Sequence, residues 1–174
     1  MVNVFDVTQT DGKELPVPES STLGSSDAGD MLWSRLTEAC PVPWRLARLS
    51  PGVHGCYHPR DQRIEISEAL TVDHRAKTMA HEIAHHLAAV SGLDTAVDRL
   101  FGGQDAYARG EVIAEGAAFV FCSYFGLDTA GYSFDYVANW SRHDPEAVLK
   151  WGEAVQKVAR MLIELVEKDA KNAA

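Results

Sequence analysis

One helical segment constrains this chain more than any other, because it carries the motif H-E-x-x-H. The motif reads His81-Glu82-Ile83-Ala84-His85 and lies within the segment 72–90, which contains no proline or glycine. Residues four apart lie on the same face of an α-helix, so His81 and His85 can direct their imidazoles to one point. Two imidazoles so placed are typical ligands of a divalent metal, and Glu82 beside them can take a proton from a metal-bound water.

The sequence around the motif carries the signals of a well-defined helix. Thr71 precedes the segment as an N-cap, and Gly92 follows it where a C-cap glycine belongs. Apolar residues recur at a 4-4-3 spacing that predicts one buried stripe, made of Met79, Ile83, Leu87 and Val90. The competing interpretation is a pair of ordinary surface histidines beside a solvated glutamate.

A second helical segment, Arg109–Phe121, carries two acids four residues apart, Glu111 and Glu115. Two carboxylates on one face of a helix of small apolar residues are costly to bury unless a positive group meets them. We therefore expect one carboxylate to bind the metal and the other to accept the free N–H of a ligand histidine. The spacing does not decide which acid does which, and a solvated acidic edge is the alternative.

Composition narrows the class of protein. With 174 residues, of which 46% are hydrophobic, the chain can bury the core of one domain. A formal net charge of −9 argues against a nucleic-acid partner, because phosphate contacts need clustered lysine and arginine. We expect no signal peptide, because the N-terminal residues lack a basic region followed by an apolar stretch, and no apolar run reaches the roughly 18 residues of a membrane span. Three dispersed cysteines fit reduced thiols in a cytoplasmic protein: Cys40, Cys56 and Cys122.

The predicted elements give an α+β fold. Residues 1–30 read as an N-terminal arm with one short strand, Asn3–Thr8, and residues 31–174 as the main domain. A small, mostly antiparallel sheet should pack on the motif helix and the glutamate helix. The remaining expected elements are a helix at Met31–Ala39 capped by Asp30, a strand at Trp44–Leu49, a hairpin at Gly55–Ser67, a short helix at Ser133–Trp140 and a final helix from Asp144-Pro145 to about Lys168.

The last strand of the hairpin, Arg63–Ser67, directly precedes the motif helix, so we expect it to form the sheet edge beside the site. An extended peptide substrate can pair with such an edge. The final helix has a coiled-coil-like seam that we expect to dock on the glutamate helix of its own domain, which favours a monomer. Homodimerisation through the same seam is the alternative; the seam comprises Val148, Trp151, Val155, Val158, Leu162 and Leu165.

The motif and the segment Glu111–Phe119 together resemble the gluzincin peptidases, which implies that residues 31–174 form a zincin-like metallopeptidase domain. The hairpin sequence at 55–60 and 63–66 resembles the ImmA/IrrE-like group. The stretches Val4–Gly12, Tyr107–Phe119 and Tyr136–Trp140 are more similar to the metallopeptidase domain of ArdC-type antirestriction proteins, also called polyvalent-protein metallopeptidases. This resemblance covers most of residues 3–165, although Gly110 stands where the ArdC pattern often has an acid.

The resemblance implies one zinc ion per chain, with His81, His85 and Glu111 as ligands and Glu82 as general base. It implies that Glu115 steadies a ligand histidine, although the two acids could be exchanged. ArdC proteins carry a single-stranded-DNA-binding domain ahead of this one. Because this chain begins at the peptidase domain, we do not expect nucleic-acid binding from it.

A peptidase also needs a donor for the oxygen that becomes negatively charged during hydrolysis. Tyr107, one turn before Glu111, and Tyr136 are the candidates, with His143 behind them. The first functional hypothesis is a cytoplasmic zinc metallopeptidase that cleaves a protein partner, for example a regulator. The second is an antirestriction-type protein of a mobile element that binds rather than cleaves, and the third is a structural module with a closed metal site.

Overall fold

The computed structural model describes residues 23–94, 103–133 and 145–172. Most of the N-terminal arm, including the expected strand Asn3–Thr8, lies outside these ranges, as does nearly all of the helix expected at Ser133–Trp140. The described elements, in chain order, are α1 (Asp27–Ala39), β1 (Trp44–Ala47), β2 (Gly55–His58), β3 (Arg63–Ser67), α2 (Val72–Val90), α4 (Gly103–Tyr124) and α6 (Pro145–Asn172).

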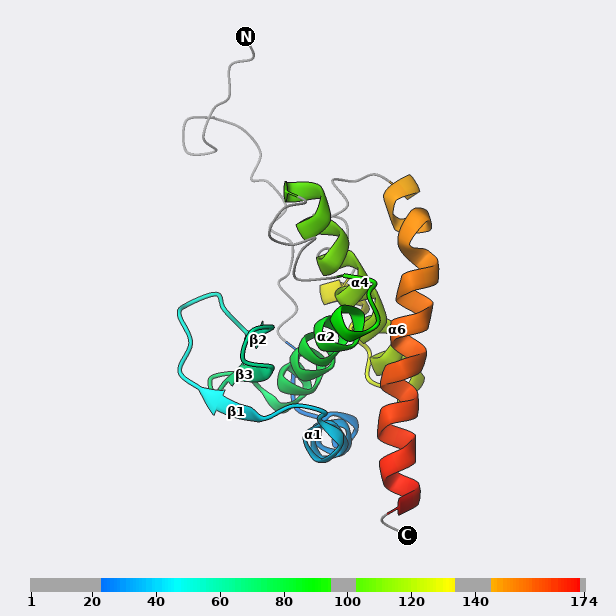
Figure 1. The fold of residues 1–174 in the computed structure, drawn as a ribbon. Helices are drawn as coiled ribbons and strands as arrows, with labels where there is room; N and C mark the ends of the chain where they lie inside the picture. The colour runs from blue at the N-terminus through cyan, green and yellow to red at the C-terminus, as the bar shows by residue number, and fades with distance from the viewer. Residues whose placement is uncertain (1–22, 95–102, 134–144, 173–174) are drawn as a thin grey trace, which may run out of the picture.

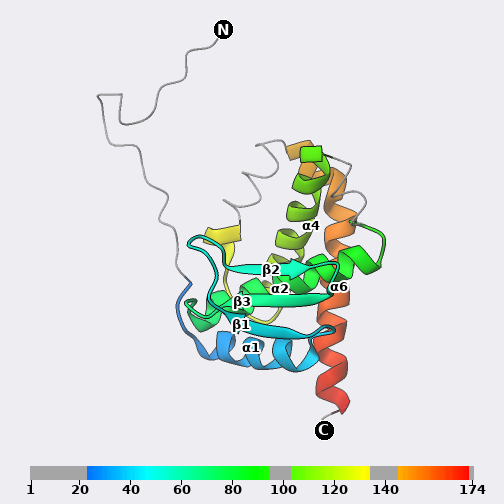
Figure 2. The ribbon, with the colours of Figure 1, turned by 60° about the vertical axis from the view of Figure 1, so that its left-hand side comes forward.

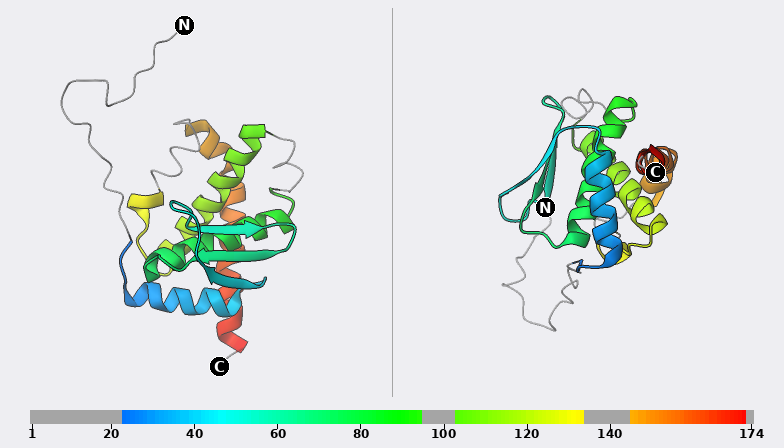
Figure 3. Two further views of the ribbon diagram at one scale, coloured as in Figure 1. Left: turned by 90° about the vertical axis from the view of Figure 1, so that its left-hand side faces the viewer. Right: turned by 90° about the horizontal axis from the view of Figure 1, so that it is seen from below.

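The elements form layers around α2. The three-stranded sheet covers one side of α2, α1 runs alongside, and α4 and then α6 lie on the side away from the sheet (Figures 1 and 3). This α+β arrangement confirms the predicted zincin-like fold class. The α2 helix is thus enclosed by neighbours, which places the H-E-x-x-H motif at the centre of the molecule.

The sheet has the strand order β1-β3-β2, so β3 is its central strand (Figure 2). β2 and β3 form the expected antiparallel hairpin, whereas β1 pairs with β3 in parallel. The expectation that Arg63–Ser67 forms the sheet edge beside the site was therefore wrong. β1 occupies the second flank of β3, and the strand edge that faces the motif helix belongs to β2.

The first helix begins earlier than expected, because Ser26 and not Asp30 is its N-cap. The Ser26 hydroxyl oxygen accepts a hydrogen bond from the Gly29 N–H at 3.1 Å. Asp73 at the start of α2 accepts hydrogen bonds from both the backbone N–H and the hydroxyl of Ser26, each at 2.9 Å. A contact between residues 47 positions apart thus fixes the start of α1, and it places residues 27–30 in the folded domain.

Almost the whole surface of α2 is buried, because the sheet, α1, α4 and α6 all contact it. Met79 and Ile83 are fully buried against the other core residues, as the stripe predicted. Val90, the last residue of the predicted stripe, is 58% exposed, since α2 ends there. His86, on the same helix, is also buried, with its Nδ1 atom 3.1 Å from the Tyr57 hydroxyl.

The final helix packs on α4 within the same chain, as expected. Gly116 allows this close approach, because a Cβ atom at that position would lie 3.0 Å from Val155 Cγ1. Val158 and Leu162 of the predicted seam are buried in the core. Among the described residues, no helix has the length and apolar character needed to cross a membrane.

Candidate metal centre

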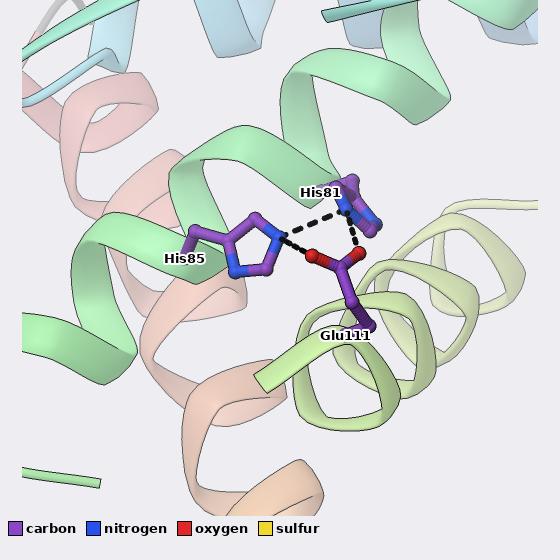
Figure 4. A group of neighbouring side chains, drawn as sticks. All are labelled: His81, His85 and Glu111. Carbon is purple, nitrogen blue, oxygen red and sulfur yellow. Dashed lines mark hydrogen bonds and ion pairs between the residues drawn. The ribbon is translucent and has the colours of Figure 1, made fainter. Parts of the chain in front are cut away.

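Three buried side chains from α2 and α4 converge on one point. His81 and His85 extend from neighbouring turns of α2 toward Glu111 on α4 (Figure 4). Their Nε2 atoms lie 3.0 Å apart, and the Glu111 carboxylate oxygens lie 3.5 Å from His81 Nε2 and 3.6 Å from His85 Nε2. One candidate ligand atom from each of the three residues lies within 4.8 Å of the others.

This geometry fits a divalent metal. Nitrogen ligands about 2.0–2.1 Å from a tetrahedral zinc lie roughly 3.3 Å from each other, close to the separation of the two imidazole nitrogens here. Two imidazoles and one carboxylate also form the three-ligand set of a catalytic zinc, which leaves one position open for water. Within the described ranges, the cluster contains these three residues and no fourth ligand.

Glu115 lies on the opposite side of the His81 ring and is fully buried. Its Oε2 atom accepts a hydrogen bond from His81 Nδ1 at 2.9 Å and another from Lys77 Nζ at 2.6 Å. This contact holds one proton of His81 on Nδ1, so Nε2 is the nitrogen that can give up its proton and bind a metal. The two acids therefore take different positions, with Glu111 in the three-residue cluster and Glu115 behind a histidine.

The charges of the cluster are mutually stabilised. Burial opposes the charged form of His81, but hydrogen bonds to Glu111 and Glu115 outweigh burial and raise the pKa of His81 to about 9. Burial also opposes ionisation of Glu111, yet hydrogen bonds with His81 and His85 hold its pKa far below the usual range. For Glu115, the hydrogen bond with His81 and the charge of Lys77 outweigh burial and lower the pKa to about 2. The site thus holds two ionised carboxylates that a cation can neutralise.

Glu82 is buried beside the cluster and contacts the sheet edge. The backbone N–H of Tyr57 in β2 donates a hydrogen bond to its carboxylate, and burial, reinforced by the charge of Glu111, raises its pKa. Gly55 permits this contact, since a Cβ atom there would lie 2.9 Å from Glu82 Oε1 and 2.6 Å from Thr78 Cγ2. A raised pKa suits a carboxylate that must take up and release a proton.

A polar cleft of roughly 310 Å³ opens beside the cluster. Its walls come from the β1–β2 connection, α2, the start of α4 and a short helical turn at 130–133, and they comprise Gly52, Val53, His54, Gly55, Lys77, Thr78, His81, Glu82, Tyr107 and Tyr132. Tyr107, expected as an oxygen-binding donor, lines this cleft and is 44% exposed. Tyr136 and His143 lie outside the described residues.

Sequence reasoning missed a second group of side chains in the cleft wall. The Tyr132 hydroxyl lies 3.2 Å from His54 Nδ1, and His74 packs its ring against both residues. Lys77 Nζ lies 4.1 Å from the centre of the Tyr132 ring. Lys77 could have been found from its spacing, because it stands four residues before His81 on the same helix face. The other three residues are far apart in sequence and gave no such signal.

The protein is similar to two solved structures of the antirestriction protein ArdC from the R388 plasmid. Against the Mn(II)-bound form the TM-score is 0.54 with 24% identity, and the match covers 83% of this chain and 54% of ArdC. Against the metal-free form the TM-score is 0.53 with 22% identity, and the match covers 94% of this chain and 60% of ArdC. These matches show a shared fold over little more than half the length of ArdC.

No curated protein matches the chain significantly. The model of the MPTase-PolyVal family, described as a zincin-like metallopeptidase, matches residues 47–152. That region contains β2, β3, the H-E-x-x-H helix and the glutamate helix. Zinc is the metal that such a domain implies, and the donor set described above suits it. The chain belongs to the MPTase-PolyVal family of zincin-like metallopeptidases.

Proposed function

We propose that this protein is a zinc-dependent metallopeptidase that hydrolyses peptide bonds of a protein partner in the cytoplasm. The observation that carries the proposal is the convergence of His81, His85 and Glu111 beside the carboxylate of Glu82 and an open cleft. In this assignment the first three residues hold one zinc ion and Glu115 orients His81. A regulator is the kind of partner that the ImmA/IrrE resemblance suggests.

Bound zinc would supply Lewis acidity that lowers the pKa of a coordinated water and polarises the scissile carbonyl. Glu82 is the general base in this proposal, and it passes the proton on to the departing amine. Its hydrogen bond from the Tyr57 N–H holds the carboxylate at the cleft, and its raised pKa makes it a stronger base for the proton of the water.

Tyr132 and His54 are the better placed donors for the substrate oxygen among the described residues. Both line the cleft together with Glu82, and their side chains contact each other. Burial, with a smaller effect of the Glu115 charge, raises the pKa of Tyr132 to about 12, so its phenol remains protonated and able to donate. Tyr107 also lines the cleft and remains a second candidate.

The edge of β2 is the proposed pairing surface for an extended substrate. In an antiparallel pair, alternate residues direct their backbone groups away from the partner strand. The His54 carbonyl accepts a hydrogen bond from the Ser67 N–H, so the backbone groups of His54 point toward β3. By alternation, the backbone N–H and C=O groups of Gly55 and Tyr57 point away from β3. The Tyr57 N–H already reaches Glu82, which places this edge next to the proposed general base.

Metal analysis tests the proposed centre. Purified protein should contain about one equivalent of zinc per chain, and the His81→Ala variant should lose it, because two of three ligands do not hold zinc tightly. His58→Ala is a matched control, since His58 contacts Glu65 on the sheet and not the cluster. Equal zinc in wild type and His81→Ala would refute the ligand assignment.

A second candidate function is antirestriction by binding without cleavage. The observation that favours it is the similarity to ArdC, whose structures carry the description antirestriction protein. The Glu82→Gln variant separates the two candidates, because it should keep zinc and lose about 10²–10⁴-fold in peptide hydrolysis. If that variant protects DNA from restriction in cells as well as wild type does, binding and not hydrolysis is the function.

A further inference from the structure

Lys77 is a buried cation next to the metal centre. It stands one turn before His81 on α2, and the residue is 3% exposed. Its Nζ atom lies 2.6 Å from Glu115 Oε2 and 4.1 Å from the centre of the Tyr132 ring. Burying an ammonium costs free energy unless a carboxylate and further contacts compensate its charge. Glu115 provides the carboxylate, and the Tyr132 ring provides a cation–π contact.

Lys77 and His81 share one acceptor atom. Glu115 Oε2 accepts hydrogen bonds from Lys77 Nζ at 2.6 Å and from His81 Nδ1 at 2.9 Å. A carboxylate oxygen that already faces an ammonium is a weaker acceptor for an imidazole N–H. The imidazole then gives less electron density to a metal at Nε2, because the carboxylate behind a ligand histidine increases its basicity.

Lys77 also changes the total charge of the buried site. Three buried carboxyl groups surround the cluster, those of Glu82, Glu111 and Glu115. Without a metal, the ammonium of Lys77 lies 2.6 Å from Glu115 Oε2 and compensates the charge of that carboxylate. When a metal is bound, the ammonium of Lys77 repels the metal ion, since charges interact strongly where water is excluded.

We propose that Lys77 is a positioning residue that acts as a built-in counter-ion of the metal centre. Lys77 holds Glu115 behind His81 when no metal is bound. When a metal is bound, Lys77 lowers the affinity of the site for that metal. The protein thereby keeps a preassembled site at the cost of some metal affinity. This inference rests on the metal centre described under the proposed function.

The first test is zinc affinity, measured by competition with a chelating dye in wild type and Lys77→Met. We expect Lys77→Met to bind zinc about tenfold more tightly, an effect on the scale of those seen for groups behind metal ligands. If Lys77 only held Glu115 in place, its replacement would release Glu115 and zinc would bind more weakly than in wild type. Equal or weaker binding by Lys77→Met overturns the proposal.

The second test is thermal unfolding of the chelator-treated proteins. Lys77→Met should unfold at a lower temperature than wild type, since the buried carboxylate of Glu115 loses the ammonium and keeps only its contact with His81. The double variant Lys77→Met/Glu115→Gln should recover part of this loss, because the pair is then neutral. If Lys77→Met folds only when zinc is present, recovery of metal-free folding in the double variant supports the proposal. A double variant that is no more stable than Lys77→Met contradicts it.

Two matched variants complete the design. Lys77→Arg keeps the charge and should bind zinc within a few-fold of wild type. Lys157→Met removes a lysine from the exposed face of α6 and should leave both measurements unchanged. If wild type binds no zinc at the cluster, the proposed metal centre itself fails. If wild type binds zinc and Lys77→Met binds it no more tightly, only the role of Lys77 fails.

Discussion

At the scale of single residues, Gly55 leaves no room for a side chain beside the proposed general base. An added methyl group would lie 2.9 Å from Glu82 Oε1 and 2.6 Å from Thr78 Cγ2, and neither α2 nor β2 has free space to receive it. We predict that Gly55→Ala displaces Glu82 and lowers peptidase turnover about 100-fold, the effect of misplacing a reacting group by about 1 Å. Zinc content should stay near one equivalent, because the ligands lie on other residues. Steady-state kinetics with parallel metal analysis measures both, and full activity would contradict the proposed constraint.

His74 gives a prediction for pH. Burial lowers the pKa of His74 to about 4, with smaller effects of His54 and Lys77, whereas an unfolded histidine has a pKa near 6.5. Between these values the unfolded chain binds a proton that the folded protein refuses, so folding stability falls as pH decreases from about 6.5 to 4. The shift corresponds to at most about 3 kcal/mol from this residue.

The variant His74→Phe isolates that contribution. Phenylalanine can keep the ring contacts with His54 and Tyr132 and carries no titrating group. Urea unfolding at pH 7 and pH 4.5 should show a smaller loss of stability in His74→Phe than in wild type. Identical losses would mean that the buried imidazole does not control acid sensitivity.

At the scale of elements, the contact between α4 and α6 depends on one small residue. A Cβ atom at Gly116 would lie 3.0 and 3.1 Å from the two γ-carbons of Val155. We predict that Gly116→Leu forces the helices apart and lowers the free energy of unfolding by about 1–3 kcal/mol. Gly152→Ala on α6 is the control, because no atom lies within 4 Å of its added Cβ. That control should stabilise the helix by up to about 1 kcal/mol, and denaturant unfolding compares the two.

The elements with local sequence signals were predicted well. The H-E-x-x-H helix spans Val72–Val90 as expected, and the hairpin Gly55–Ser67 has the expected turn, with Gln62 at a φ of 47°. The parallel pairing of β1 with β3 was not predictable, because no local pattern encodes which flank of a strand another strand will join. The cap of α1 was missed for a similar reason, since Asp73 fixes Ser26 from a distant position.

The same distinction holds for the site. Helical spacing placed His81 with His85 and Glu111 with Glu115, and the structure brings all four residues together. The spacing could not reveal that Tyr132 and His54 meet across the cleft, because chain folding and not periodicity joins them. The burial of His86 is not encoded locally either, because it depends on Tyr57, a residue of the hairpin.

At the scale of the whole molecule, zinc should stabilise the fold. Its proposed ligands join α2 to α4, and an unfolded chain does not offer them together. At a free zinc concentration about 1,000 times the dissociation constant, the gain should be about 4 kcal/mol. Thermal unfolding with and without chelator should therefore show a clear difference in wild type and none in His81→Ala. A chelator-insensitive wild type would argue against a metal in this core.

The parallel pairing of β1 with β3 also governs how the sheet can assemble. A short turn, 59–62, joins β2 to β3, so this hairpin can form within roughly 1–10 μs. β1 must instead reach past the hairpin and close a longer loop before it can add to the far flank of β3. A nascent chain caught before that step exposes a bare strand with the apolar residues Ile64 and Ile66, which is a template for self-association during synthesis.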